Sequence, residues 1–368
     1  MSAFTPDDAR FMARALQLAR RGLYTTDPNP RVGCVLVKDG EVMSEGWHER
    51  AGGPHAEVVA LNVAGAHSRG STAYVSLEPC CHHGRTPPCT RALITAGVAR
   101  VVAAMPDPNP KVASQGIAEL EQAGIRVDIG LMQVEAERLN PGFVSRMTRG
   151  RPYLRVKLAA SLDGRTALAS GESKWITGEA ARADVQRLRA RSSAILTGVG
   201  TVLADDPSLT VRDFDIGRQP LRVVVDGHLS MRPDARLLHL PGQTLVVTAA
   251  DDDAYAEPLL AAGAEVMVLP AGPDTVDLVT LMQDLGQRGV NELLVEGGAT
   301  VCGALLRAGL VDELVLYLAP HILGSGARGM FTLPGLESMQ DRIALRIQDV
   351  RAVGQDWRIT ALVANASW

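Results

Sequence analysis

The chain has 368 residues, 46% hydrophobic and 21% charged, which is typical of a globular protein large enough for two domains. The formal charge is −4 and the first half is nearly neutral, so the chain lacks the basic excess that is typical of nucleic-acid-binding proteins. We therefore expect no nucleic-acid partner and no membrane partner. Five cysteines are too few for a disulfide framework and residues 1–16 contain no apolar signal segment, so we expect the reducing cytoplasm, where clustered Cys and His bind metals or act in catalysis.

The first half alternates between helical and extended patterns. Residues 7–22 form a helical pattern with one apolar face, made by Phe11, Met12, Ala15, Leu18 and Ala19. Residues 32–47 predict a hairpin that turns at Asp39-Gly40. The elements expected next are a helix from Pro54, a strand over 72–79, a helix from Pro87-Pro88, a strand over 100–105, a helix over 118–124 and a strand over 125–130. This order predicts a mixed sheet covered by helices.

A domain boundary is expected near residue 150, where the polar stretch 146–152 contains Gly150 and Pro152. We therefore divide the chain into domains 1–148 and 149–368. The second half alternates again, and its expected elements are a helix over 179–192, strands over 193–200, 221–227 and 244–250, a helix over 254–263, a strand over 264–270, a helix over 278–289, a strand over 292–298, a helix through Leu306 and two closing strands.

Cysteine and histidine cluster around residues 76–89, SLEPCCHHGRTPPC. With His55 upstream, Cys80 and Cys89 give three protein ligands and leave a fourth position for water, which is the pattern of a catalytic zinc. Pro54 and Pro87-Pro88 suit the first turn of a helix, so His55 and Cys89 are expected at helix N-termini. The partial positive charge there lowers the pKa of a thiol and favours the metal-binding thiolate.

Glu57 follows two residues after His55 and is not needed as a ligand. Its carboxylate could take a proton from the zinc-bound water and pass it to a departing amine. The alternative is that HAE is a chance tripeptide and that the cysteines are small buried hydrophobic residues. The order H-A-E, strand, P-C, loop, Cys at a helix start favours the catalytic site, with eight residues between Cys80 and Cys89.

Three segments, NPRVG at 29–33, HAE at 55–57 and LEPCCHHGRTPPC at 77–89, together resemble the deaminase half of the bifunctional riboflavin-biosynthesis deaminase–reductases. The resemblance implies a cytidine-deaminase-like, three-layer α/β/α domain that binds Zn²⁺. It implies that Glu57 is the proton shuttle and that Asn29 contacts the pyrimidine. The zinc ligands that it implies are His55, Cys80 and Cys89. Cys81 is interpreted as a spectator, and His82 and His83 as loop or substrate contacts.

The second half is similar to the reductase half of the same family, which has a dihydrofolate-reductase-like α/β fold. The matching segments are 156–177, 197–212 and 292–306. The resemblance implies NADPH contacts at Ala159, Trp175, Thr201, Asp205, Gly227, Gly298, Ala299, Thr300, Val301, Cys302, Gly303 and Ala304. It implies substrate contacts at Ser173, Arg189, Leu209, Arg212 and Glu296. Gly227-His228 departs from the family, which commonly has Ser followed by a basic residue there.

Residue patterns alone leave other interpretations open for this half. Gly297-Gly298 before a helix frees backbone N–H groups for a phosphate, or simply makes a tight turn. Trp175 in isolation would be a core residue. Asp205 and Arg212 could be solvated loop charges, and Arg189 could belong to a solvated helix face. Arginine does suit a ribose 5-phosphate, because its guanidinium makes bidentate contacts.

The resemblance implies two consecutive steps of riboflavin synthesis: deamination of 2,5-diamino-6-(5-phosphoribosylamino)pyrimidin-4(3H)-one, then NADPH-dependent reduction of the ribosyl group to ribityl. The expected partners are this phosphorylated pyrimidine and further copies of the chain. One alternative is an RNA or nucleoside zinc deaminase with an appended nucleotide-binding domain. Another is a non-catalytic nucleotide-binding regulator built on the same folds.

Overall fold

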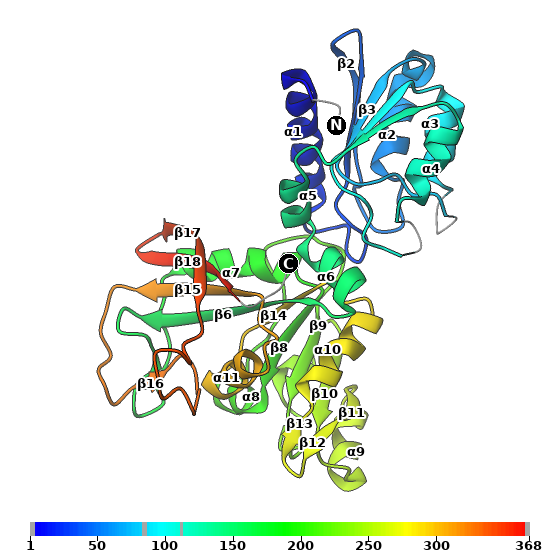
Figure 1. Cartoon of the computed structure of the whole chain (residues 1–368). Coiled ribbons are helices and arrows are strands. Elements are labelled where there is room, and N and C mark those ends of the chain that lie inside the picture. Colours follow the sequence, from blue (N-terminus) through cyan, green and yellow to red (C-terminus); the bar gives the residue numbers. More distant parts are fainter. Residues whose placement is uncertain (1–3, 83–86, 111–112, 365–368) are drawn as a thin grey trace. The chain divides into compact units, whose positions relative to one another are not determined.

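The computed structural model describes residues 4–82, 87–110 and 113–364. The chain separates into two units, Met1–Gly150 and Arg151–Trp368, each with its own hydrophobic core (Figure 1). Among the described residues, no helix combines the length and the hydrophobicity that crossing a bilayer requires.

The first unit begins with a helix whose sequence determines both its start and its buried face. The hydroxyl of Thr5 caps α1 (Pro6–Ala19) by accepting a hydrogen bond from the N–H of Asp8 at 3.1 Å. In return, the Asp8 carboxylate accepts one from the N–H of Thr5 at 2.9 Å. Every residue predicted for the apolar face is buried: Phe11, Met12, Ala15, Leu18 and Ala19. The predicted helix is confirmed.

A five-stranded sheet with the order β2-β1-β3-β4-β5 forms the centre of this unit. β1 is antiparallel to β2 and β3, and β3, β4 and β5 are parallel. The predicted hairpin turns at Asp39 and Gly40, whose φ angles of 53° and 81° suit a two-residue turn. The elements after α1 are η1 (Arg20–Gly22), β1 (Gly33–Lys38), β2 (Glu41–Trp47), α2 (Ala56–Ala64), η2 (Gly65–Ser68), β3 (Thr72–Val75), α3 (Cys89–Ala96), β4 (Arg100–Ala103), α4 (Gln115–Gln122), β5 (Arg126–Ile129), α5 (Gln133–Leu139) and α6 (Pro141–Arg149).

Helices α1 and α2 cover opposite faces of the sheet. Gly33 in β1 lies so close to α1 that an added Cβ would be 2.0 Å from the carbonyl oxygen of Ala15. Gly46 in β2 approaches α2 in the same way, 2.4 Å from the carbonyl oxygen of Ala56. Gly46 pairs with Cys34, so these two residues face the same side of the sheet. Cys34 follows Gly33 in β1, and successive residues of a strand face opposite sides, so Gly33 and Gly46 face opposite helical layers. The predicted α/β/α arrangement is confirmed.

Helices α5 and α6 are absent from the sequence-based expectations. The stretch 146–152, interpreted as a polar boundary, begins inside α6. Pro141 occupies the first turn of this helix, and its inward face is buried at Phe143 and Ser145. Polar RMTR therefore belongs to an amphipathic helix.

A nine-stranded sheet with the order β11-β10-β9-β8-β14-β6-β15-β18-β17 organises the second unit. The strands from β11 to β15 are parallel, and a β17–β18 hairpin closes one edge. The elements are β6 (Tyr153–Ser161), β7 (Arg165–Ala167), α7 (Glu179–Arg191), β8 (Ala194–Gly198), α8 (Val199–Asp205), β9 (Leu221–Val225), η3 (Arg236–Leu238), β10 (Thr244–Thr248), α9 (Asp253–Ala261), β11 (Glu265–Val268), β12 (Pro270–Gly272), β13 (Thr275–Val276), α10 (Leu278–Gln287), β14 (Glu292–Val295), α11 (Ala299–Arg307), β15 (Glu313–Ala319), β16 (Arg328–Gly329), β17 (Leu345–Val353) and β18 (Asp356–Val363).

The prediction of two closing strands is wrong, because β15, β17 and β18 all follow α11, with the short β16 between them. A register shift between Ile347 and Asp349 interrupts the alternation of β17. The side chain of Ile347 is 61% exposed, so this strand also lacks the buried face from which a strand is usually recognised.

Candidate functional site

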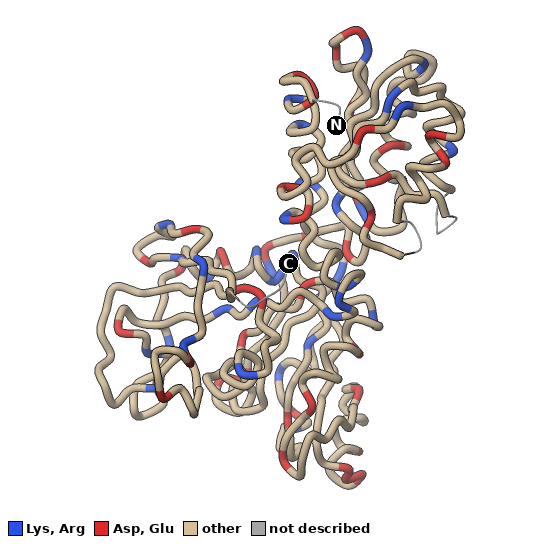
Figure 2. The backbone as a smooth tube through the Cα atoms, viewed as in Figure 1, with Lys and Arg blue, Asp and Glu red and all other residues tan. Residues whose placement is uncertain are grey.

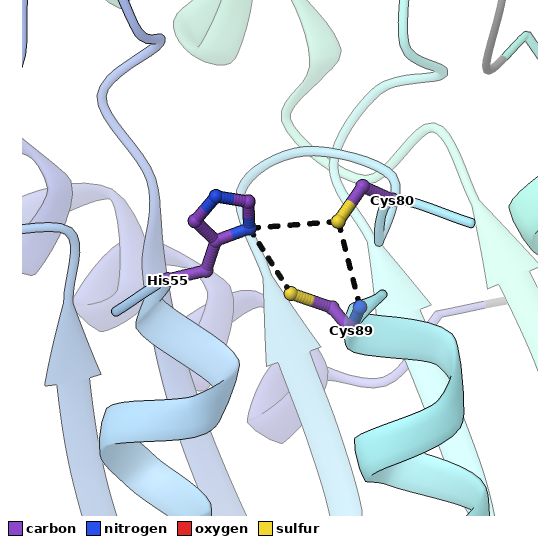
Figure 3. Close-up of side chains that lie close together, drawn as sticks. All are labelled: His55, Cys80 and Cys89. Atoms are coloured by element: carbon purple, nitrogen blue, oxygen red, sulfur yellow. Dashed lines mark hydrogen bonds between the residues drawn. The ribbon is translucent and has the colours of Figure 1, made fainter. Parts of the chain in front are cut away.

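The three predicted ligands of the first unit lie together, His55 and Cys89 at two helix starts and Cys80 in a loop (Figure 3). His55 is the N-cap of α2, and Cys89 is the first residue of α3, as predicted. The Nδ1 atom of His55 is 3.2 Å from the Sγ atom of Cys89 and 3.5 Å from that of Cys80. All three ligand atoms lie within 4.8 Å of one another. A nitrogen and a sulfur bound to one tetrahedral zinc are about 3.5 Å apart, so this donor set fits the metal.

The electrostatics of the cluster also suit a cation. A hydrogen bond from the thiol of Cys89 lowers the pKa of Cys80 to about 4, which makes Cys80 a thiolate. The hydrogen bond to Cys80 raises the pKa of His55. The Cys80–Cys89 hydrogen bond, together with burial, raises the pKa of Cys89, so the two cysteines share one negative charge. A bound metal would replace the shared protons.

Glu57 lies beside this cluster in the first turn of α2 and is 3% exposed. Burial, followed by the negative charge of Cys80, raises the pKa of its carboxyl group to about 7. Its carboxylate contacts the thiol of Cys89. A carboxyl group that exchanges protons near neutral pH and lies next to a metal site has the properties of a general acid–base.

A cavity of about 340 Å³ opens over these residues, a size typical of small-molecule sites. Asn29 lines it, as the pyrimidine-contact prediction requires, together with His48, which the sequence analysis missed. The Nδ1 atom of His48 donates to the carbonyl oxygen of Pro54 at 2.9 Å, and its Nε2 atom is 3.1 Å from Nδ2 of Asn29. The described lining residues are Pro28, Asn29, Pro30, Val32, His48, Gly52, Gly53, His55, Glu57, Leu77, Glu78, Cys80, His82, Asp107, Asn109, Phe143, Arg146 and Met147.

Two buried carboxylates of the cavity wall were also missed. Glu78 accepts backbone hydrogen bonds from Asp107, Ser114, Gly116 and Ile117 at 3.0 to 3.3 Å, and so holds the loop before α4. Burial raises the pKa of Asp107 to about 6. A Glu between Leu and Pro-Cys carries no pattern that predicts such long-range contacts.

The remaining residues of the 80–89 segment fall into two groups. Cys81 is absent from the metal cluster and from the described lining of the cavity. His82 lines the cavity, which is compatible with its predicted role as a loop or substrate contact. His83 lies outside the described residues.

In the second unit, two of the predicted cofactor segments follow neighbouring parallel strands, at the carboxyl ends of those strands. Strands β6, β14 and β8 are parallel neighbours, so the segments after their carboxyl ends meet there. Both α8 and α11 begin after a glycine N-cap with no side-chain cap, Gly198 and Gly298. A Cβ on Gly298 would be 3.7 Å from Oγ1 of Thr201, which places the two helix starts side by side. Adjacent open N-termini suit the pyrophosphate of a dinucleotide.

Other predicted cofactor residues have varied surroundings. Ala159 is half-buried in β6, and Asp205 ends α8, where Lys174 pairs with its carboxylate at 3.3 Å. Trp175 is 72% exposed and Arg182 stacks on its ring at 4.7 Å, so the core alternative is wrong. A Cβ on Gly227 would be 2.5 Å from the carbonyl oxygen of Asp274, so backbone packing by itself requires this glycine.

Residues 298–304 divide between the helix start and the core. Gly298 and Thr300 are exposed and Ala299 and Ala304 are half-buried, whereas Val301, Cys302 and Gly303 are buried. A Cβ on Gly303 would be 2.1 Å from the carbonyl oxygen of Thr332, so packing accounts for that glycine too. Cofactor contacts at the buried positions stay predictions.

The predicted substrate residues centre on a buried ion pair. Arg189 makes a fork with Glu296, with N–O distances of 2.6 and 3.0 Å, and donates to the carbonyl oxygen of Thr210 at 3.1 Å. Lys157, which was missed, lies 3.9 Å from Glu296.

The other three predicted substrate residues differ in exposure. Arg212 is exposed, and its charge still acts on Glu296. Leu209 is buried with a φ of 46°, and Ser173 is half-buried. The solvated-face alternative for Arg189 is wrong, because its side chain is 13% exposed.

Comparisons with known proteins cover nearly the whole chain. Residues 5–105 match the cytidine and deoxycytidylate deaminase zinc-binding region, and residues 152–359 match the RibD C-terminal domain. The riboflavin biosynthesis protein RibD of Escherichia coli is 54% identical over 362 residues, which cover 95% of this chain and 97% of that protein. The RibD of Haemophilus influenzae is 47% identical over 372 residues, with 98% of each covered.

Solved structures agree with these relatives. A structure of Acinetobacter baumannii RibD is 46% identical, covers 98% of this chain and 99% of that chain, and has a TM-score of 0.90. A diaminohydroxyphosphoribosylaminopyrimidine deaminase/5-amino-6-(5-phosphoribosylamino)uracil reductase from Thermotoga maritima is 32% identical, covers 97% and 99%, and has a TM-score of 0.86. The chain therefore belongs to the RibD family of bifunctional riboflavin-biosynthesis deaminase–reductases.

Proposed function

We propose that the first unit removes the 2-amino group of 2,5-diamino-6-(5-phosphoribosylamino)pyrimidin-4(3H)-one as ammonia, at a zinc held by His55, Cys80 and Cys89. We propose that the second unit then reduces the ribosyl group of the product to ribityl with NADPH. The matches of the two units to a zinc-binding deaminase region and to the RibD C-terminal domain support this division of labour. The observation that carries the proposal is the His55–Cys80–Cys89 cluster with buried Glu57 beside it.

In the deaminase unit, Glu57 moves protons and the cavity wall orients the pyrimidine. Zinc, when bound, supplies hydroxide near neutral pH by lowering the pKa of its water to about 7. Glu57 takes a proton at its carboxylate and returns it to the leaving amine. Asn29 contacts the pyrimidine, and the hydrogen bond between its side-chain amide and the ring of His48 orients it.

In the reductase unit, the chain's contribution is binding and orientation. NADPH, when bound, supplies the hydride. The helix starts at Gly198 and Gly298 bind its phosphates, and the exposed ring of Trp175 is a wall for the cofactor. Arg189, Glu296 and Arg212 bind the phosphorylated ribosyl substrate.

The charge distribution fits a small-molecule substrate better than RNA. Figure 2 shows Lys and Arg interspersed with Asp and Glu over both units, without a continuous basic stripe among the described residues. RNA binding needs such a stripe to neutralise phosphates along the backbone.

The test is a Glu57→Gln variant of the full chain, assayed for ammonia release from the diaminopyrimidine and for NADPH oxidation with the deaminated product. Because a positioned general base contributes about 100- to 10,000-fold, we expect deaminase kcat to fall at least about 100-fold while zinc stays bound. Reductase activity should be unchanged. A variant that deaminates normally would remove Glu57 from the mechanism, and one that loses both activities while folded would contradict two independent sites.

A further inference from the structure

Helix α6 forms one wall of the deaminase cavity. Phe143, Arg146 and Met147 all line the cavity, at positions i, i+3 and i+4 of the helix. Phe143 is 7% exposed and belongs to the hydrophobic core of the unit, so it fixes the rotation of the helix. Arg146 therefore faces the same space as Glu57 and the metal cluster.

The same helix is tied to the loop that carries Asn29. The carboxamide of Asn140, the residue before α6, accepts from the N–H of Arg31 at 2.8 Å and donates to its carbonyl oxygen at 3.0 Å. The guanidinium of Arg31 in turn donates to the carbonyl oxygen of Leu139 at 2.8 Å. These three bonds are buried, so they fix the segment that carries Asn29 to the start of the helix that carries Arg146.

Arg146 is the only Lys or Arg among the described residues that line the cavity, whereas Glu57, Glu78 and Asp107 are all carboxylic acids. Its side chain is half-buried, and that burial lowers its pKa. The carboxylate whose charge acts on it is Asp27, and not one of the three in the cavity. Among the described residues, the cavity thus has an acidic side near the metal cluster and one guanidinium, on α6.

We propose that Arg146 binds the 5-phosphate of the deaminase substrate. This assignment rests on the proposed deaminase function. A phosphate dianion is repelled by the acidic side of the cavity and attracted to the α6 wall. A guanidinium binds phosphate oxygens through two parallel hydrogen bonds, a stronger and more directional contact than an ammonium makes. With the pyrimidine at Asn29 and the phosphate at Arg146, the tied loop and helix would recognise both ends of one molecule.

The experiment compares Arg146→Gln, Arg146→Lys and the control Arg138→Gln in the full chain. Arg138 is exposed on α5 and does not line the cavity, so this control removes the same charge from the unit. Ammonia release is measured with the phosphorylated diaminopyrimidine and with its dephosphorylated ribosylamino analogue, and zinc content is measured for each variant.

For Arg146→Gln we expect the KM of the phosphorylated substrate to rise about 10- to 100-fold, the cost of losing hydrogen bonds to a charged group. The kcat should change little, and kcat/KM for the dephosphorylated analogue should not change. Arg146→Lys should recover part of the loss, and Arg138→Gln should behave as wild type.

Three results would overturn the assignment. If both substrates suffer equally, Arg146 is structural. If neither suffers, the phosphate is bound elsewhere, and a KM increase in Arg85→Gln would then point to the 83–86 segment, which lies outside the described residues. If the wild-type chain deaminates neither substrate, the proposed deaminase function itself fails. This outcome is seen without any variant, so it is distinct from a failure of the Arg146 assignment alone.

Discussion

The carboxylate of Glu78 holds together the loop that forms one side of the deaminase cavity. Its Oε2 atom accepts from the N–H groups of Asp107 and Ser114 at 3.0 and 3.1 Å. Its Oε1 atom accepts from those of Gly116 and Ile117, at 3.1 and 3.3 Å, in the first turn of α4. Ser114, the N-cap of α4, makes no capping bond with its own side chain, so Glu78 provides the cap from a distant part of the sequence.

Glu78→Gln preserves the shape of this side chain but replaces one oxygen with an amide NH₂. Whichever oxygen is replaced, two backbone N–H groups lose their acceptor, and one of the two is buried, that of Asp107 or that of Gly116. An unsatisfied buried N–H costs about 1–3 kcal/mol, and the lost charge at the helix start adds about 0.3–1 kcal/mol. We therefore expect the free energy of unfolding of the first unit to fall by about 1–4 kcal/mol, a sizeable part of the 5–15 kcal/mol typical of a domain.

Calorimetry of the full chain measures this loss, and hydrogen exchange of the amides of Asp107, Ser114, Gly116 and Ile117 locates it. Glu121→Gln is the control, because Glu121 is exposed on the same helix. The Glu78 variant should lose protection at these four amides, and deaminase activity should fall because Asp107 and Asn109 line the cavity. A stability loss no greater than that of the control would refute this role.

Two further predictions concern charged groups elsewhere. Arg189→Ala should destabilise the second unit by up to about 3–5 kcal/mol in urea unfolding, because it removes the bidentate partner of buried Glu296 and leaves only the longer contact with Lys157 at 3.9 Å. Arg212→Ala should raise the reductase KM for the phosphorylated substrate without a stability loss, and equal stability of the two variants would contradict the buried pair. Burial raises the pKa of Asp8, but hydrogen bonds from Arg100, Thr5 and Tyr74 outweigh it and hold this pKa well below its ordinary value of 3.8. The ionised Asp8 therefore stabilises the fold fully above about pH 3.8, and this stabilisation is lost as the pH falls further. Between pH 5 and pH 2, urea unfolding should show a smaller loss of stability for Asp8→Asn than for wild type, and identical pH dependence would contradict this linkage.

The sequence predicts well those elements whose signals are local. Helix α1 has its cap and its apolar face within one stretch, and the β1–β2 hairpin has Asp39-Gly40 at its turn. The metal cluster was also predictable, because Pro54 and Pro87-Pro88 indicate two helix starts next to His55 and Cys89. Each of these features depends on neighbours in the sequence.

Features that depend on distant partners were not predicted. Helix α6 lines the cavity, and Asn140 before it is hydrogen-bonded to Arg31, 109 residues earlier. His48 contacts the side chain of Asn29, 19 residues earlier, and Glu78 accepts from the N–H of Asp107, 29 residues later, so no short motif reveals these two residues. Strand β17 lacks a buried face, and its register shift removes the periodicity from which strands are predicted.

Zinc analysis of the purified chain and of two cysteine variants tests the central claim most directly. Wild type should hold about one zinc per chain, Cys80→Ser should lose zinc and deaminase activity together, and Cys81→Ser should lose neither, because the Cys80 sulfur lies within the three-ligand cluster and that of Cys81 does not. The NADPH-dependent reductase activity should persist in both variants. A wild-type chain without zinc that still deaminates, or equal zinc loss in Cys81→Ser, would contradict the account.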